Sequence, residues 1–172
     1  MRFRAIICLQ LLITAILLPG SGIAQIDSQQ SLVHTAQVWA LAKYRHPQVT
    51  SCETDWDQAL LDTAPIAAQA TSAAELSQAL RQMFNSAGGI STSADISTAP
   101  EWLKTAALTD TLKSELAGLA ALRPSEQCYV AFSQIRVPDF SADSGFTGSS
   151  ALPSEPQRLL ALFRLWGAIE YY

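Results

Sequence analysis

The sequence has few of the residues that most often carry metal or redox chemistry. It contains two histidines and three cysteines in 172 residues. His34 lies within an expected helix and His46 lies beside a proline. A zinc site needs further ligands at close spacing, such as two histidines four residues apart or a Cys-x-x-Cys pair, and the sequence has neither. We therefore expect ordinary histidines, no bound metal and no cofactor.

Glycine-flanked and glycine-rich catalytic loops are also missing. The segment Ser86-Ala87-Gly88-Gly89 lacks a glycine on each side of its serine, which a nucleophile elbow requires, and it is too short to cradle a phosphate. We interpret it as a helix end followed by a turn. Glu53, Asp55 and Asp57 lack the additional ligands and the central glycine of a calcium loop. We assign these carboxylates to a helix N-terminus, where the helix dipole favours negative charge.

Charged residues are sparse, and their balance is mildly acidic. They make up 15% of the chain, and the formal net charge is −4. A chain of this charge has no general electrostatic attraction for a nucleic-acid backbone. Nucleic acid is therefore excluded as the expected partner.

The N-terminus has the pattern of an export signal. Arg2 and Arg4 precede an uncharged apolar run over residues 5–18, which a Pro-Gly turn and small residues then end. The run is shorter than the about 20 residues that a membrane-spanning helix needs. We predict a cleaved signal peptide over residues 1–24 and a periplasmic or secreted mature chain with no permanent membrane span. An uncleaved anchor is the alternative.

The predicted mature chain keeps two cysteines, Cys52 and Cys128. In an oxidising compartment such an even pair suggests a disulfide. Two separate thiols are an equal alternative, because the sequence does not tell whether the two Cα atoms come within about 7 Å of each other.

Helical periodicity dominates residues 25–137. The fold class that it predicts is mainly α: a small helical domain of four or five helices with a minor β element. Alternation of apolar and polar residues indicates the single strand. We expect helices over 27–45, from 54 with a kink or division at Pro65, from a capping box at 72–75 to Gly88, and over 100–122, with the strand over 127–135.

A proline-, serine- and glycine-rich stretch over residues 138–156 predicts a linker. A capping-box pattern at Ser154 and Gln157 then starts a terminal helix, 157–172. More than half of its circumference is apolar, so it needs cover from two sides in water. We expect it to be the first helix of a following unit that this chain lacks.

Large aromatic side chains mark the expected contacts between helices. Because the tryptophans follow the apolar stripes of their helices, we interpret these rings as packing or interface anchors rather than as the walls of a ligand groove. Burial of one such ring contributes about 2–3 kcal/mol. The anchors are Trp39, Tyr44, Trp56, Trp102, Phe163 and Trp166.

The terminal helix also carries a family resemblance. Residues 158–172, Arg-Leu-Leu-Ala-Leu-Phe-Arg-Leu-Trp-Gly-Ala-Ile-Glu-Tyr-Tyr, resemble a segment of bacterial exported serine peptidases of the tail-specific, or C-terminal-processing, family. Residues 38–47, followed by 54–60, are similar to a related helical segment of that family. In the family, such segments lie upstream of a catalytic domain that hydrolyses peptide bonds with a serine nucleophile and a lysine base.

The resemblance implies a role without assigning a catalytic residue. Lys43, Lys104 and Lys113 lie in expected helices rather than beside a glycine-flanked serine. We therefore expect a non-catalytic N-terminal region of a peptidase (hydrolase) whose catalytic domain is missing from this chain, with a protein or peptide as its partner. A free-standing periplasmic adaptor that binds a protein through the terminal helix is the alternative. An export product with no retained function is a third.

Overall fold

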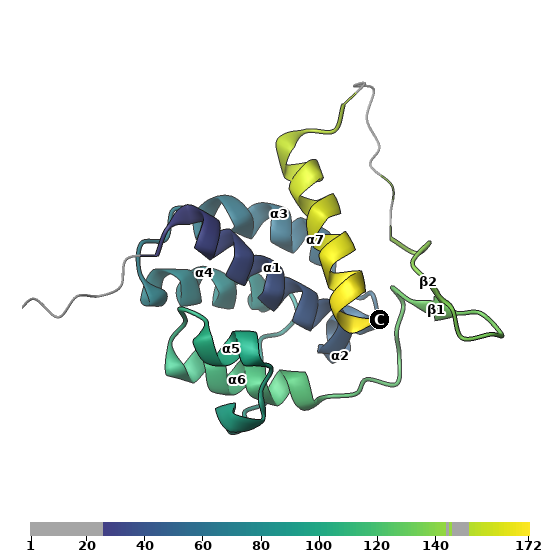
Figure 1. Cartoon of the computed structure of the whole chain (residues 1–172), viewed down its shortest axis with the longest axis horizontal. Coiled ribbons are helices and arrows are strands. Elements are labelled where there is room, and N and C mark those ends of the chain that lie inside the picture. The colour runs from purple at the N-terminus through teal and green to yellow at the C-terminus, as the bar shows by residue number, and fades with distance from the viewer. Residues whose placement is uncertain (1–25, 144, 146–151) are drawn as a thin grey trace, which may run out of the picture.

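The computed structural model describes residues 26–143, 145 and 152–172 (Figure 1), and the predicted signal peptide lies outside them. Within these residues the chain is mainly helical with one two-stranded antiparallel sheet, which confirms the predicted fold class. No helix there is long and apolar enough to cross a membrane. The helices are α1 (Ser28–Arg45), α2 (Pro47–Thr50), α3 (Trp56–Ala67), α4 (Ala73–Asn85), α5 (Glu101–Thr105), α6 (Asp110–Ala121) and α7 (Glu155–Tyr171), with a 3₁₀ turn η1 (Ile96–Thr98) and strands β1 (Ala131–Phe132) and β2 (Pro138–Asp139).

Helix α1 is the centre of the fold. It begins at Asp27, whose carboxylate accepts a hydrogen bond from the Gln30 backbone N–H at 2.7 Å. Helices α3, α4, α6 and α7 pack around it, and α2 follows its C-terminal end (Figure 1). Residues 38–42 are all buried in succession, so the middle of α1 is covered on every side. A helix that is apolar all round is stable only in such a position.

Two predicted helix starts use their side chains differently. At α4, the Ser72 hydroxyl accepts from the Glu75 backbone N–H, and the Glu75 carboxylate accepts from both the backbone N–H and the hydroxyl of Thr71. At α7 the capping box of Ser154 and Gln157 is complete, as predicted. Each cap satisfies backbone N–H groups that lack a partner within the helix.

Helix α3 starts one residue later than expected. Its N-cap is Asp55, which accepts from the Gln58 backbone N–H at 2.9 Å, while the Thr54 hydroxyl donates to the Ser86 carbonyl. Pro65 lies inside the last turn and does not divide the helix. Proline has no backbone N–H, so one i→i−4 hydrogen bond is absent there, and only two more helical residues follow it.

The single helix expected over residues 100–122 is two helices, α5 and α6, with an extended Ala106 between them. Backbone N–H groups released by this break find partners on other helices. The Ala107 N–H donates to His34 Nε2 on α1 at 3.3 Å, and the Thr109 N–H donates to the Ser77 hydroxyl on α4 at 2.9 Å. The helical period of residues 100–122 is thus overridden by tertiary contacts.

The strand expected over 127–135 is only β1, two residues long, and it pairs with β2 in the predicted linker. The register joins Ala131 to Asp139 and Phe132 to Pro138. Both residues of β1 are exposed, and Pro138 of β2 has no N–H to donate to the ladder, which keeps the strand pair short. We call residues 131–143 the arm.

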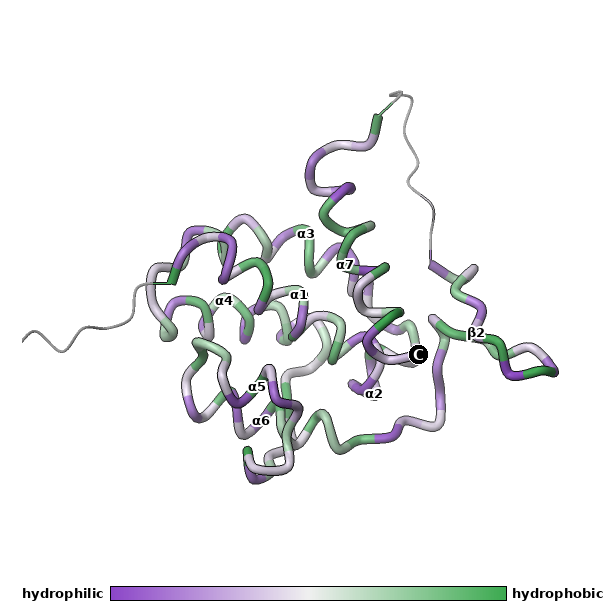
Figure 2. Tube along the Cα trace, in the orientation of Figure 1, coloured by the Kyte–Doolittle hydropathy of each residue, from purple (hydrophilic) through white to green (hydrophobic). Residues whose placement is uncertain are grey.

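Helix α7 packs on α1 and α3, whereas we expected it to belong to a following unit. Leu160 and Phe163 enter the core. Gly167 lies so close to α1 that a Cβ there would stand 3.0 Å from the Ala40 Cβ. One face of α7 therefore packs against this helical domain. Along the whole helix, hydrophobic residues are interspersed with hydrophilic ones (Figure 2).

Candidate functional site: an apolar groove and a buried charge cluster

An apolar groove runs between α1 and α7. Its larger part encloses about 400 Å³ and has no charged residue in its lining. A second hollow of about 280 Å³ continues it toward α3 and shares Leu32 and Leu159 with it. The larger part is lined mainly by Leu32, Val33, Leu159, Leu162, Phe163 and Trp166, with Gln29 and Gln37 as its polar residues.

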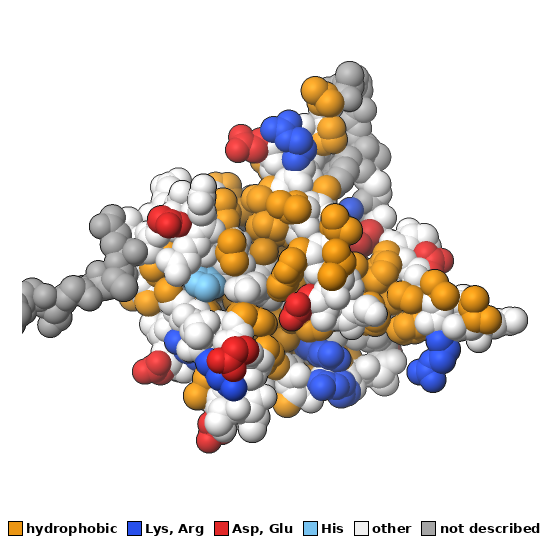
Figure 3. Space-filling model, viewed as in Figure 1, with side chains coloured by type: hydrophobic (Ala, Val, Ile, Leu, Met, Phe, Trp, Pro, Cys, Tyr) orange, Lys and Arg blue, Asp and Glu red, His pale blue; other side chains and the backbone are white. Residues whose placement is uncertain are grey.

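Large apolar side chains extend the groove over the outer face of α7. Leu162 is 59% exposed, Leu165 60% and Ile169 73%, and Val33 on the facing side of α1 is 53% exposed. The three α7 residues follow helical spacing and form one stripe. Hydrophobic side chains gather over α1 and α7 in the space-filling view (Figure 3). A contiguous exposed apolar surface is typical of an interaction site, whereas single scattered apolar residues are ordinary on a protein surface.

The predicted anchors divide into two groups. Trp39, Tyr44, Trp56 and Phe163 are buried, so they hold the core. Trp102 and Trp166 are only partly buried at its edge. Of these two, Trp166 lines the groove, so it is the anchor placed to contact a partner.

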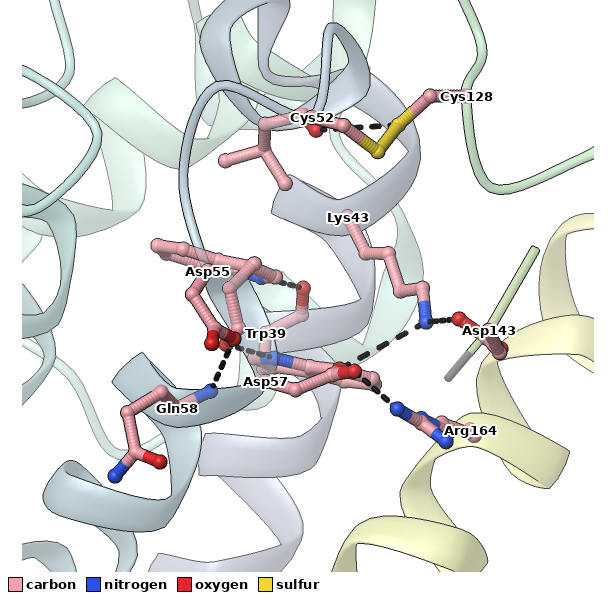
Figure 4. A network of polar contacts seen from close by, with 11 residues as sticks. Trp39, Lys43, Cys52, Asp55, Asp57, Gln58, Cys128, Asp143 and Arg164 are labelled. Atoms are coloured by element: carbon pink, nitrogen blue, oxygen red, sulfur yellow. Dashed lines mark hydrogen bonds and ion pairs between the residues drawn. A yellow bond between two sulfur atoms is a disulfide. The ribbon is translucent and has the colours of Figure 1, made fainter. Parts of the chain in front are cut away.

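A cluster of four charged residues lies where α1, α3, α7 and the arm meet (Figure 4). Lys43 of α1 is fully buried, and its Nζ donates to Asp143 Oδ1 of the arm at 2.5 Å. Asp57 of α3 pairs with Arg164 of α7, and its other oxygen lies 3.9 Å from the Lys43 Nζ. The cluster joins three helices and the arm, and each charge has an opposite charge beside it.

Aromatic rings complete the surroundings of Lys43. Its Nζ lies 5.0 Å from the ring centroid of Trp39 and 4.5 Å from that of Tyr129, within reach of cation–π attraction. Burial lowers the pKa of the Lys43 ammonium, and the charges of Asp57 and Asp143 oppose that shift. Burial and the same carboxylates raise the pKa of Tyr129 to about 12, so its phenol stays protonated near neutral pH.

Replacement of Asp57 by alanine is expected to lower the free energy of unfolding by about 3 kcal/mol, because it removes the carboxylate that two buried cations share. Urea denaturation followed by circular dichroism measures the loss. Asp62 is an exposed carboxylate on the same helix, and Asp62→Ala is the matched control with an expected change below about 0.5 kcal/mol. Equal losses for the two variants would contradict a buried role for Asp57.

The structure joins Cys52 and Cys128 in a disulfide, with their Cα atoms 6.0 Å apart. The bridge ties the turn after α2 to the chain just before the arm, and the Cys128 N–H also donates to the Thr50 carbonyl at 2.9 Å. Cys52 has a backbone φ of 60°, a left-handed conformation that few residues other than glycine adopt. The bridge therefore anchors the chain at Cys128 to the turn at Cys52, and this anchor limits where the next residue, Tyr129, can lie.

The residues considered for other chemistry have structural roles. His34 accepts from the Ala107 N–H, and the His46 Nε2 donates to the Gly89 carbonyl at 2.9 Å. Gly88 and Gly89 both have positive φ and form the turn that ends α4. Among the described residues, no group of three or more His, Cys, Asp or Glu side chains is placed to hold a metal ion.

Sequence reasoning missed the charge cluster. Asp57 was assigned only to a helix N-terminus, where it does lie, and Lys43 only to a helix. The one available signal was a lysine in an otherwise apolar stretch of α1. Asp143 is 100 residues from Lys43 along the chain, and Arg164 is 107 residues from its partner Asp57.

Comparison with protein-family models, curated proteins and solved structures gave no match. The function proposed for this chain therefore rests on its own residues and on their geometry.

Proposed function

We propose that this chain is a non-catalytic helical module that binds a tail-specific serine peptidase through the groove between α1 and α7. The observation that carries the proposal is the larger part of the groove, which has no charged residue in its lining and continues into the exposed stripe of Leu162, Leu165 and Ile169. The resemblance of residues 158–172 to the pre-catalytic region of such peptidases supplies the partner. The same helix thus carries both the surface and the resemblance.

The occupant that fits this groove is the apolar face of a helix in the peptidase's catalytic domain. A cleft between two packed helices accepts side chains of a third helix at the spacing of successive turns. The larger hollow offers no charge to pair with an ionic side chain, so leucine-like side chains are favoured. Trp166 lies at its edge and supplies a large ring of the type enriched at binding hot spots.

The predicted export signal agrees with this partner, since the peptidases of that family are exported. The module positions or stabilises the catalytic domain and supplies none of the reacting groups. A surface of exposed leucines can bind a partner without polar contacts, because the burial of apolar surface away from water provides the binding free energy.

The test is binding of the chain to the catalytic domain of a tail-specific peptidase encoded in the same genome, measured by calorimetry. Leu162→Asp is expected to weaken binding at least about tenfold, because it places a charge in the apolar contact and removes a leucine worth about 2 kcal/mol. Ala161 is exposed on the same helix and does not line the groove, so Ala161→Asp is the matched control and is expected to bind like the unchanged chain.

Absence of binding by the unchanged chain would overturn the proposal, and so would equal weakening by the two variants. Binding of an unrelated protein at Leu162, with none of the catalytic domain, would favour the free-standing adaptor instead.

A further inference from the structure

The contact between Lys43 and Asp143 differs from an ordinary surface ion pair. Lys43 has no exposed side-chain area, and its Nζ is held between the rings of Trp39 and Tyr129 and the Asp143 carboxylate. In Figure 4, Lys43, Asp143 and Arg164 converge from three different segments. The carboxylate reaches Lys43 from the arm, which is the last part of the chain before the undescribed residues.

The helices alone leave this cluster short of negative charge. They contribute two cations, Lys43 and Arg164, and one carboxylate, Asp57, whose closer contact is with Arg164. A buried ammonium without a close anion is strongly disfavoured. The three charged residues on the helices, Lys43, Asp57 and Arg164, therefore require a second anion. That anion binds next to the Lys43 ammonium.

The arm that supplies the anion is a short extension held to the helices mainly by Phe132 and Phe140, whereas the other three charges lie on helices that pack on one another. Its strands have two residues each, and Ile135 at its turn is 82% exposed. The arm extends away from the helices in Figure 1. Its aromatic contacts are with one residue at the chain end, where the rings of Phe132 and Phe140 lie 5.8 and 5.7 Å from that of Tyr172. Local opening of such a segment costs far less than unfolding of the helices.

We propose that Lys43, Arg164 and Asp57 form a carboxylate-binding site, which Asp143 of the arm occupies in this structure and from which the carboxylate of an acidic ligand displaces it. Asp143 is the chain's own stand-in for that ligand. Burial lowers the pKa of Lys43 and the Asp143 carboxylate opposes that shift, so an anion held at this place stabilises the charged ammonium. The site is separate from the apolar groove and does not depend on the partner proposed for it.

The test uses Asp143→Asn, which removes the resident carboxylate and keeps the shape of the arm. The probes are N-acetyl-aspartic acid methylamide, its neutral asparagine counterpart and sodium acetate. The expected result is that the capped aspartate binds the variant at least about twofold more tightly than the unchanged chain, in which the tethered Asp143 competes at an effective concentration close to the ligand's own about millimolar dissociation constant. NMR shifts of the Lys43 ammonium and the Arg164 guanidinium report binding, and Lys104 and Lys113 serve as internal controls.

Asp139 provides the matched variant, because its carboxylate bonds only locally, accepting from the Ser141 N–H at 2.8 Å. Asp139→Asn is expected to bind the capped aspartate no better than the unchanged chain. Binding of the capped aspartate but not of acetate identifies an acidic side chain as the ligand, and binding of both identifies any small carboxylate.

Equal binding of the capped aspartate and the capped asparagine would overturn the proposal. So would the absence of a shift at Lys43 in the folded variant at a ligand concentration 50 times the about millimolar dissociation constant expected of so small a ligand. If Asp143→Asn fails to fold, the unchanged chain is titrated instead. Excess capped aspartate must then move the Asp143 backbone amide resonance together with the Lys43 ammonium, and a stationary Asp143 amide would refute displacement.

Discussion

Replacement of Trp39 by alanine is expected to lower the free energy of unfolding by about 4 kcal/mol, because it empties the centre of the core. Trp39 has no exposed area and lies where α1 meets α3. Its indole Nε1 donates to the Trp56 carbonyl at 2.9 Å, and the Trp56 Nε1 donates to the Trp39 carbonyl at 3.0 Å. Alanine removes the ring and also leaves the Trp56 carbonyl without this donor. Denaturant unfolding, followed by circular dichroism, measures the loss.

Two further variants separate packing from hydrogen bonding. Trp39→Phe keeps most of the ring and loses one hydrogen bond, so a loss of about 1–3 kcal/mol is expected from the unsatisfied carbonyl and the smaller ring. Trp102 is only partly buried, and Trp102→Ala is therefore expected to cost clearly less than Trp39→Ala. A loss at Trp102 as large as that at Trp39 would contradict the assignment of Trp39 to the centre of the core.

Loss of the disulfide is expected to lower the free energy of unfolding by a similar amount, about 4 kcal/mol. The bridge closes a loop between residues separated by 76 positions, and on the chain-entropy relation a loop of that length restricts the unfolded chain by about this free energy. The variant is Cys52→Ala with Cys128→Ala, since alanine, like cysteine, has a Cβ and carries a similar cost of the left-handed backbone at residue 52. The shift of the denaturation midpoint is the measurement.

A reducing agent provides the control for this variant. Treatment of the unchanged chain with dithiothreitol should reproduce the shift, and treatment of the double variant should add nothing. An unchanged midpoint on reduction would mean that the bridge does not restrain the unfolded chain. The arm begins three residues after Cys128, so reduction should also weaken its contact with Lys43.

Local signals in the sequence located most of the helices. Asp27 caps α1, Ser72 caps α4 and the Ser154–Gln157 box starts α7, each with the hydrogen bonds that its side chain implies. These signals work because a helix end needs partners within about one turn of the chain. The mainly α fold class follows from the same local periodicity.

The groove was only partly predictable. The apolar surplus of the terminal helix indicated that it needed cover, and the α7 stripe of Leu162, Leu165 and Ile169 does remain exposed. The sequence did not indicate that Leu160 and Gly167 would form the face packed against this same domain. Since apolar residues occur around most of α7, periodicity alone did not select the buried face.

The sequence by itself indicated the starts of α1, α4 and α7, placed the tryptophans on the apolar stripes of their helices, and showed that two cysteines remain in the predicted mature chain. Only the tertiary structure decided the division of residues 100–122 into α5 and α6, the packing of α7 on α1, and the meeting of Lys43 with Asp57, Asp143 and Arg164. Capping and periodicity act over a few residues and are written locally in the chain. A buried charge is tolerable only when distant segments bring their opposite charges to it, and that condition is set by the fold as a whole.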